Sequence, residues 1–250
     1  ARDRVRDPLR SKDTEMEAAV RAERGRAALE VEAPRHPSGP AAVPEPATVI
    51  ARGERVYIRT LVPGDLRHLA AWADDPFLER MVGSDFLRTY RRLYDGDAAF
   101  FEAALADPTQ VAFIVMTNDG RPAPVGLVRL FNIHLSEGYA FLETVIADRT
   151  CIRKGCGVEA GKLMCAYGLD VLGLQRIEAK VYEYNFLSIN SLKRNGFRQE
   201  GVLRKAGFQG GAHCDVIVFG ILREELEAQR RKEAHPELFH FPFVAEPRER

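Results

Sequence analysis

Apolar positions in the middle of the chain recur with two different periods. Alternation of apolar and polar residues predicts strands, and apolar residues three and four apart predict helices. The expected strands cover residues 55–61, 111–117, 124–131, 139–146, 176–182, 197–204 and 216–222. The expected helices begin at residue 64, with an interruption at 75–76, and cover 97–105, 157–172 and 187–195. This irregular order predicts an α/β (α+β) domain with a mixed sheet that carries helices on its faces.

The two ends of the chain differ from this middle. Residues 1–47 combine clusters of opposite charge with alanines and end in a proline-rich stretch, which is typical of a solvated helix and an extended linker. Residues 223–233 have the pattern of a charged helix, and the tail beyond them carries Phe239, Phe241 and Phe243. These three rings are expected to pack either on the domain or on a partner. We therefore predict an arm and linker at 1–47, a main domain at 48–222, and a helix and tail at 223–250.

Composition narrows the classes of partner and compartment. The chain has 250 residues, 46% of them apolar, and its 36 basic and 36 acidic side chains cancel. A zero net charge gives no electrostatic reason to expect nucleic acid or an anionic membrane as the main partner. No apolar run approaches the roughly 20 residues that cross a bilayer. The four cysteines show neither a CxxC pair nor zinc-type spacing, so we expect reduced thiols, a cytoplasmic location and no metal site.

The loop before the long expected helix carries the candidate chemistry. Gly155 and Gly157 allow a tight turn, and the helix that follows directs the positive end of its dipole at the same space. Arg149, Arg153 and Lys154 add positive charge. Backbone donors, a helix start and cations together predict a cradle for a phosphate or a pyrophosphate.

Several phosphate-binding motifs compete for this loop. A Walker loop is excluded because no Gly-x4-Gly-Lys-Ser/Thr sequence occurs. A dinucleotide fingerprint, Gly155-x-Gly157-x-x-Ala160 with Glu178 as the ribose carboxylate, would indicate an NAD-dependent oxidoreductase. A basic loop separates its first glycine from the preceding strand, which counts against this alternative.

Four motifs in order carry a resemblance to a known family. They are Lys154-Gly-Cys-Gly157-Val-Glu159-Ala160, Arg176-Ile-Glu-Ala, Asn185-Phe-Leu-Ser188 and Asn195-Gly196-Phe197. With the opening segment at 58–65, they resemble the GNAT superfamily of acetyl-CoA-dependent N-acetyltransferases over about residues 53–222. The likeness is greatest to the branch of ribosomal-protein alanine and spermidine N-acetyltransferases. It implies a largely antiparallel sheet in which the strands at 139–146 and 176–182 splay apart, with helices on both faces.

The resemblance also implies where acetyl-CoA lies. Its acetyl-pantetheine arm is expected between the splayed strands, and its pyrophosphate is expected on the glycine loop. A backbone N–H near Thr144–Ile146, where the family has a bulge, would hold the oxyanion. The implied cosubstrate-binding residues are Val145, Ile146, Arg153, Lys154, Gly155, Cys156, Gly157, Val158, Asn185 and Ser188. The implied acceptor is a primary amine of a protein N-terminus or of a small molecule, and a homodimer is left open.

Acetyl transfer needs a group that removes a proton from the amine. A primary amine is mostly protonated at neutral pH, because the pKa of a lysine amine is about 10.4. Glu143 is the best candidate base, since alternation places it on a face with Phe141 and Val145, and an apolar setting raises a carboxyl pKa. An ion-paired Glu143 is the competing interpretation. His134 and His213 have suitable intrinsic pKa values but are more typical of exposed histidines.

Two positions depart from the family pattern. Ile152 stands where the loop usually begins with Gln or Arg, and Leu192 stands where many members have a tyrosine that protonates the departing thiolate. Ser188, Tyr182 or Tyr184 could supply that proton, or the thiolate could leave without an acid. We therefore expect direct acetyl transfer in a ternary complex, with catalytic Glu143, Ser188 and Tyr182. A non-catalytic acyl-CoA-binding regulatory module is the main alternative, and Cys156 is expected to be a small filler of the loop.

Overall fold

The computed structural model describes residues 47–83, 87 and 106–241. The expected helix at 97–105, Phe243 and all but the last residue of the predicted N-terminal arm lie outside these residues. The fold is therefore described for the main domain and the segment that follows it.

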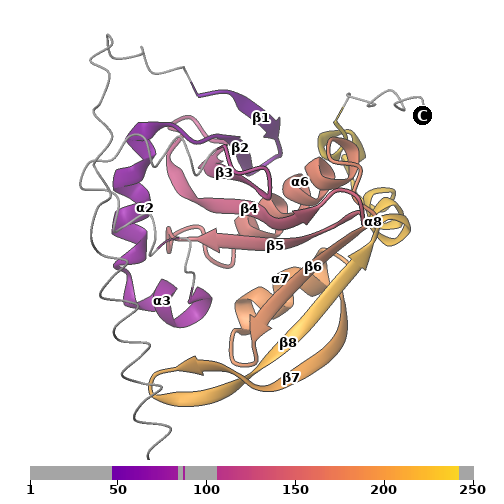
Figure 1. The fold of residues 1–250 in the computed structure, drawn as a ribbon. Coiled ribbons are helices and arrows are strands. Elements are labelled where there is room, and N and C mark those ends of the chain that lie inside the picture. Colours follow the sequence, from indigo (N-terminus) through magenta and orange to yellow (C-terminus); the bar gives the residue numbers. More distant parts are fainter. Residues whose placement is uncertain (1–46, 84–86, 88–105, 242–250) are drawn as a thin grey trace, which may run out of the picture. The chain divides into compact units, whose positions relative to one another are not determined.

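The described residues form one eight-stranded sheet in the order β1-β2-β3-β4-β5-β6-β8-β7 (Figure 1). Neighbouring strands are antiparallel except β5 and β6, which are parallel. The strands are β1 Val49–Arg52, β2 Val56–Thr60, β3 Gln110–Thr117, β4 Pro124–His134, β5 Tyr139–Ile146, β6 Arg176–Tyr182, β7 Arg198–Gln209 and β8 Ala212–Leu222. The predicted mixed, largely antiparallel sheet is confirmed. A doubly wound dinucleotide fold, which needs consecutive parallel strands, is not formed by these residues.

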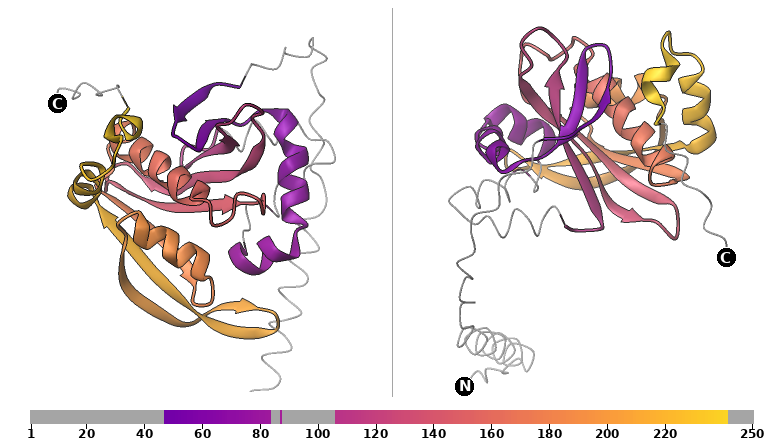
Figure 2. Two further views of the ribbon diagram at one scale, coloured as in Figure 1. Left: turned by 180° about the vertical axis from the view of Figure 1, so that it is seen from behind. Right: turned by 90° about the horizontal axis from the view of Figure 1, so that it is seen from above.

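Helices cover both faces of the sheet, as predicted. Figure 2 shows α6 and α8 on one face, with α2 on the other. The α-helices are α2 Leu66–Ala73, α3 Pro76–Val82, α6 Cys156–Asp170, α7 Phe186–Arg194 and α8 Arg223–Arg230, and the 3-10 helices are η1 Pro63–Asp65 and η2 Pro236–Phe239. The interruption expected at 75–76 separates α2 from α3. Asp75 caps α3 by accepting a hydrogen bond from the Phe77 N–H at 2.8 Å.

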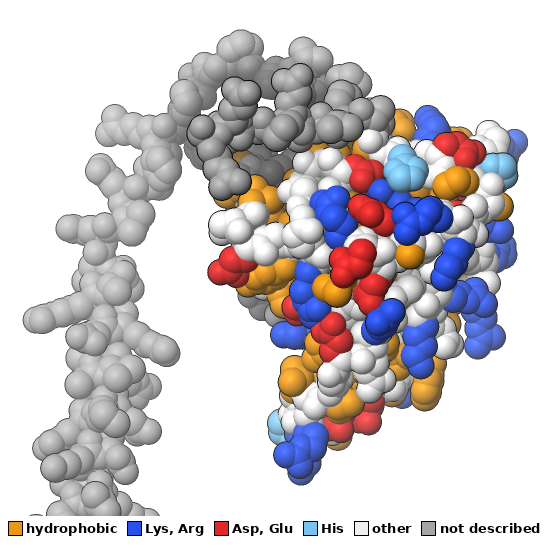
Figure 3. All heavy atoms as spheres, turned by 90° about the vertical axis from the view of Figure 1, so that its right-hand side faces the viewer, with side chains coloured by type: hydrophobic (Ala, Val, Ile, Leu, Met, Phe, Trp, Pro, Cys, Tyr) orange, Lys and Arg blue, Asp and Glu red, His pale blue; other side chains and the backbone are white. Residues whose placement is uncertain are grey.

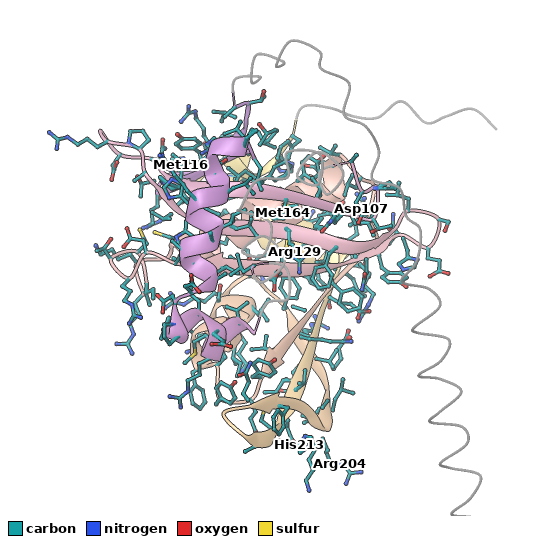
Figure 4. The ribbon with its side chains drawn as sticks, turned by 60° about the vertical axis from the view of Figure 1, so that its left-hand side comes forward. Asp107, Met116, Arg129, Met164, Arg204 and His213 are labelled. Carbon is teal, nitrogen blue, oxygen red and sulfur yellow. The ribbon has the colours of Figure 1, made fainter. Side chains whose placement is uncertain are left out.

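Two apolar cores lie on opposite faces of the sheet. One contains Met164 of α6 together with Val128 and Ala140 of the sheet. The other contains Met116 and Val145 of the sheet together with buried side chains of α2 and α3. Figure 4 labels both methionines, one in each layer. On the face in Figure 3, basic and acidic side chains are interspersed and do not gather by sign.

The parallel pair β5 and β6 separates along its length. The two strands pair only at Tyr139, Ala140 and Phe141 of β5. On its other side β5 stays paired with β4 as far as Ile146. From Leu142 to Ile146, β5 therefore has a partner strand on one side alone. The predicted splay of these two strands is confirmed.

The bulge that was expected near Thr144–Ile146 is not found in the pairing of β4 with β5. Six consecutive one-to-one pairs run from Gly126↔Ile146 to Phe131↔Phe141. The irregularity lies at the other end, between Phe131 and His134, where Asn132 has a φ of +47°. Beyond Ile146, however, the N–H groups of Ala147 and Asp148 both donate to the Val125 carbonyl oxygen, at 2.8 and 3.1 Å. Two successive donors on one carbonyl are the bonding pattern of a bulge, which here lies one residue beyond the expected position.

The β7–β8 hairpin is longer than predicted. A broad turn was expected at 207–211, but strand pairing continues to Gln209 and Ala212. The turn itself is Gly210-Gly211, and both residues have positive φ angles of +60° and +82°. Two left-handed residues match the twist of a two-residue hairpin, and glycine adopts this conformation without strain.

The segment after β8 packs on the domain. Leu226 of α8 and Phe239 of η2 are buried in the same core as α6, and Phe241 packs against it. Arg230 donates two hydrogen bonds to the carboxylate of Asp170, at 2.9 and 3.0 Å. For Phe239 and Phe241, the structure thus selects packing on the domain over packing on a partner. The division of the chain into three parts stays a prediction.

Candidate functional site

A groove of about 790 Å³ opens where β5 and β6 separate. Glu143, Thr144 and Ile146 of β5 line one wall, and 179–182 of β6 line the other. Side chains of α3 close one end, and the glycine loop reaches the groove through Arg153, Gly155, Gly157 and Val158. Most of the predicted site residues are thus brought to one cavity.

The glycine loop ends at Gly155, the N-cap of α6, which has a φ of +90°. Glu159 N–H donates to the Gly155 carbonyl oxygen at 2.9 Å, the first hydrogen bond of this helix. The N–H groups of Cys156, Gly157 and Val158 lie in the first turn, where a helix offers no acceptor. The predicted pyrophosphate cradle depends on these donors and on the helix dipole, and binding of an anion there stays a prediction.

Close packing at Gly157 sets the distance between this helix and β5. A Cβ atom at Gly157 would lie 3.2 Å from Cγ1 of Ile146, which is tighter than ordinary van der Waals contact. Ile146 itself lines the groove, as predicted. Val145 does not: its side chain is 1% exposed and lies in the core on the α2 side of the sheet. The Val145 side chain is therefore not a groove contact.

Glu159 anchors the glycine-loop helix to the turn between β1 and β2. Its carboxylate accepts three backbone hydrogen bonds, from Glu54 at 3.0 Å, Arg55 at 2.7 Å and Val56 at 2.8 Å. The side chain is buried. The sequence analysis noted this glutamate in a motif but did not predict its role, because its partners lie about a hundred residues away in the chain.

Glu143 lines the groove as an ion-paired carboxylate. Its Oε2 lies 2.5 Å from Nε of Arg129, the residue directly opposite on β4. Their side chains are 16% and 12% exposed, and the Arg129 guanidinium lies over the ring of Phe131 at 4.5 Å. The expected apolar setting is therefore wrong, and the competing ion-paired interpretation is correct. Glu143 stays the candidate base because it is the carboxylate among the described residues that line the groove.

The two candidate histidines do not line the groove. The His134 ring stacks on Tyr139 with centroids 4.5 Å apart. The His213 ring contacts Phe208 near the hairpin turn, and Figure 4 shows it far from Arg129, the partner of Glu143. Neither is placed to take a proton from an amine in the groove.

Two of the candidate acids line the groove, and one does not. Tyr182 and Ser188 both line it. The Tyr182 ring stacks on Tyr184 with centroids 5.5 Å apart. The Tyr184 hydroxyl donates to the backbone oxygen of Arg80 at 2.9 Å, and desolvation raises its pKa. Tyr184 thus ties β6 to α3, and Tyr182 and Ser188 stay candidates for protonating a thiolate.

Asn185 lines the groove, but its amide is already engaged on both sides. Its Oδ1 accepts from Ser188 N–H at 3.1 Å and so caps α7. Its Nδ2 donates to the Met81 carbonyl oxygen at 2.8 Å. Asn185 therefore joins α7 to the end of α3. These two hydrogen bonds account for an asparagine at this position through its role in holding the two helices together.

Burial accounts for Cys156 of the glycine loop and for Leu192, one of the two residues that depart from the family pattern. Desolvation raises the pKa of Cys156 to about 11, so this thiol stays protonated at neutral pH, as expected of a filler. Leu192 is buried in the core beside α6 and, like Ile152, lines the groove. Within 47–83, 87 and 106–241 no three His, Cys, Asp or Glu side chains are grouped to hold a metal ion. None of the helices in those ranges is long and apolar enough to cross a membrane.

Comparison with known proteins adds family information to this geometry. The family model described as an acetyltransferase (GNAT) domain matches residues 55–198. The SPbeta prophage-derived uncharacterized N-acetyltransferase YokL of Bacillus subtilis (strain 168) is 28% identical over 175 residues, which are 70% of this chain and 94% of that protein. Alpha/beta-tubulin-N-acetyltransferase 9 of Mus musculus is 30% identical over 152 residues, which are 56% of this chain and 61% of that protein.

Solved structures share the fold. The spermidine N-acetyltransferase from Vibrio cholerae in complex with CoA and spermine superposes with a TM-score of 0.61 at 22% identity, over 69% of this chain and 98% of that chain. A putative acetyltransferase from T. thermophilus superposes with a TM-score of 0.56 at 22% identity, over 73% of this chain and 93% of that chain. At this identity the likeness establishes the architecture, and the predicted fold is confirmed.

Proposed function

Because this chain belongs to the GNAT acetyltransferase family, we propose that it transfers an acetyl group from acetyl-CoA to a primary amine. The observation that carries the proposal is one continuous groove. It begins between β5 and β6 and ends at the glycine loop and the start of α6. One end suits an extended arm that carries amide groups, and the other suits a pyrophosphate.

The splayed strands support binding of the pantetheine arm. Backbone N–H and C=O groups of β5 beyond Phe141 have no strand partner on the β6 side. An arm that contains amide groups can satisfy them as an added strand does. At the other end, the first-turn N–H groups of Gly157 and Val158, with Arg153 and Lys154, supply donors and positive charge for the pyrophosphate.

The side chains of the groove support direct transfer. Glu143 accepts a proton from the amine, directly or through a water, and the amine nitrogen attacks the thioester carbonyl carbon. A nitrogen–carbon bond forms, the carbon–sulfur bond breaks, and the thiolate takes a proton from Tyr182 or Ser188. The nitrogen loses its second proton as the amide forms, and that proton returns to Tyr182 or Ser188, while the proton on Glu143 is released to solvent. The Arg129 guanidinium holds the Glu143 carboxylate in place across β4 and β5. No covalent intermediate on the enzyme is required.

The acceptor class is a primary amine of a protein N-terminus or of a small molecule. The names of the similar proteins include both a tubulin and a spermidine acetyltransferase. These names support an amine acceptor in general and leave both kinds within the proposal.

The test is acetyl transfer by the full chain to a panel of amines, read by mass spectrometry of the acceptor. The panel holds peptides with free N-termini, polyamines and amino-sugars. Transfer to at least one acceptor is expected. In Glu143→Gln, kcat should fall by about 10²–10⁴, the usual contribution of a general base, with KM for acetyl-CoA changed less than about threefold.

Glu137→Gln is the matched control, because Glu137 is exposed in the turn between β4 and β5. It should retain the wild-type rate. Binding of acetyl-CoA without transfer to any amine would instead support the non-catalytic module. Equal rates in wild type and Glu143→Gln would remove Glu143 as the base.

A further inference from the structure

Lys180 of β6 lines the groove, and the proposed transfer gives this side chain no role. Its side chain is exposed. Among the residues that the structure describes, no carboxylate forms an ion pair with it. The groove therefore contains an ammonium group that is available to a ligand.

The side chain of Lys180 points to the same face of the sheet as that of Glu143. Ala179 and Val181, the neighbours of Lys180 along β6, are buried in the core on the α6 side. Leu142, the neighbour of Glu143 along β5, is buried in the same core. Because side chains alternate between the faces of a strand, Lys180 and Glu143 both face away from α6.

Lys180 and Glu143 also occupy matching positions along their strands. Phe141 of β5 is in register with Glu178 of β6, and this is the last pair before the two strands separate. Two residues further along are Glu143 on one wall and Lys180 on the other, and both line the groove. An acceptor amine that reaches the Glu143 carboxylate is therefore flanked by the Lys180 ammonium group across the groove.

Charged neighbours of Lys180 on this face are already paired. Glu143 is paired with Arg129, and Glu178 accepts from Arg176 at 2.8 Å. Glu143 is also the single carboxylate among the described residues that line the groove. Its charge is balanced by Arg129, so Lys180 leaves one positive charge in excess beside the acceptor amine.

The aromatic rings beside Glu143 do not compensate for this charge. Ring faces attract cations through cation–π contact. Here Lys180 Nζ itself lies 5.1 Å from the centroid of the Phe141 ring. The Arg129 guanidinium lies 4.5 Å from the centroid of the Phe131 ring, and the two rings are in contact with centroids 5.6 Å apart. The protein's own cations thus make the contacts that a second cationic group of an acceptor would need.

We propose that Lys180 selects an acceptor that carries a carboxylate close to its primary amine. This role rests on the proposed function and narrows its acceptor class. With the amine at Glu143, the carboxylate accepts a charge-assisted hydrogen bond from Lys180 Nζ. A polyamine would instead bring a further positive charge to Lys180, and repulsion between like charges disfavours it. Such a carboxylate belongs either to a free amino acid or to an acidic residue near a peptide N-terminus.

The test measures kcat/KM of the full chain, at saturating acetyl-CoA, for two pairs of acceptors. One pair is alanine and alaninamide. The other is two amidated tetrapeptides that have glutamate or glutamine in second place. Within each pair, the ratio of kcat/KM for the carboxylate over that for the amide is compared between protein variants. Intrinsic differences between the amines cancel in this comparison, because every variant meets the same molecules.

Lys180→Met removes the charge and keeps an apolar side chain of similar length against Phe141. It should lower the ratio at least about threefold in one or both pairs, since an ion pair at an exposed side chain is modest in strength. The loss should appear in KM for the carboxylate acceptor, while KM for acetyl-CoA changes less than about twofold. Lys193→Met is the matched control, because Lys193 is exposed on α7 and does not line the groove. It should leave both ratios within about twofold of wild type.

Charge reversal at the same position gives a second test. Lys180→Glu should raise kcat/KM for spermidine at least about threefold above the wild-type value, because repulsion becomes attraction. It should also lower both carboxylate ratios. No rise for spermidine would contradict electrostatic selection by Lys180.

The outcomes separate this role from the proposed function. If wild type acetylates no amine, the proposed function fails and the role of Lys180 fails with it. If amines are acetylated but Lys180→Met changes neither ratio by about threefold, transfer stands and selection by Lys180 is overturned. A wild-type kcat/KM for spermidine above that for both carboxylate acceptors would also overturn it. A change confined to one pair supports the role and tells a free amino acid from an acidic peptide end.

Discussion

Replacing Glu159 by glutamine removes one of the two oxygens that hold the turn between β1 and β2. In the wild type, Oε2 accepts from Arg55 and Val56, and Oε1 accepts from Glu54. A glutamine side chain keeps one acceptor and presents an NH₂ group in place of the other. In either orientation of the amide, at least one backbone N–H loses its acceptor. The glutamine NH₂ group then faces this N–H, so that two donors point at each other.

The cost follows from the number of donors left unpaired. An unsatisfied buried polar group costs about 1–3 kcal/mol, and here one or two N–H groups lose their partner beside a buried side chain. We expect Glu159→Gln to lower the free energy of unfolding by about 2–3 kcal/mol. For a domain of this size that corresponds to a decrease in Tm of about 5–10 °C.

Urea unfolding at pH 7, followed by fluorescence of Trp72, measures this loss. Trp72 is suited to the purpose because it is the chain's single tryptophan and packs against the core on the α2 side of the sheet. Glu137→Gln makes the same chemical change at an exposed turn and should stay within about 0.5 kcal/mol of wild type. A loss of less than about 0.5 kcal/mol in Glu159→Gln would refute the role of this carboxylate as the anchor of the turn.

Three further results follow from the geometry. Gly155→Ala should lower the free energy of unfolding in urea by about 1–2 kcal/mol, because a φ of +90° strains any residue with a Cβ. The control Gly64→Ala should lower it by less than about 0.5 kcal/mol. Equal losses in the two variants would contradict backbone strain as the cause. Asn185→Ala should cost about 1–2 kcal/mol through loss of the α7 cap. Asn185→Ser keeps a capping oxygen and loses the bond to the Met81 carbonyl oxygen, so it should be more stable than Asn185→Ala, and equal losses in the two variants would contradict the capping role. The raised pKa of Cys156, about 11, keeps its thiol protonated below that pH. Mass spectrometry should therefore show little alkylation of Cys156 by iodoacetamide at pH 8 and a rising rate toward pH 11. Rapid labelling of Cys156 at pH 8, ahead of the less buried Cys214, would contradict the raised pKa.

Local pattern was sufficient to predict the elements that make the groove. Alternation at 139–146 and 176–182 matches β5 and β6 in full, and the helix expected at 157–172 is α6 within two residues at each end. These segments are predictable because each buries the face that its own period defines. The short strand β1, at 49–52, was not predicted, since four residues carry too little periodicity.

Features that depend on register or on distant partners were not predictable. The ion pair of Glu143 with Arg129 arises because these residues are directly opposite on β4 and β5. Strand alternation alone places Glu143 on the correct face but does not tell which residue of β4 lies beside it. The anchor at Glu159 likewise joins segments far apart in the chain. Only the folded sheet brings these partners together.

Hydrogen exchange of the full chain, with and without saturating acetyl-CoA, tests most directly where the cosubstrate binds. Acetyl-CoA should slow exchange at 142–146, where β5 has no partner on the β6 side, and at 155–158 in the glycine loop and first turn of α6. Protection that is strongest at these two segments is the expected result. Unchanged exchange at both segments, or protection at the β7–β8 hairpin turn instead, would contradict the central claim that this groove is the acetyl-CoA site.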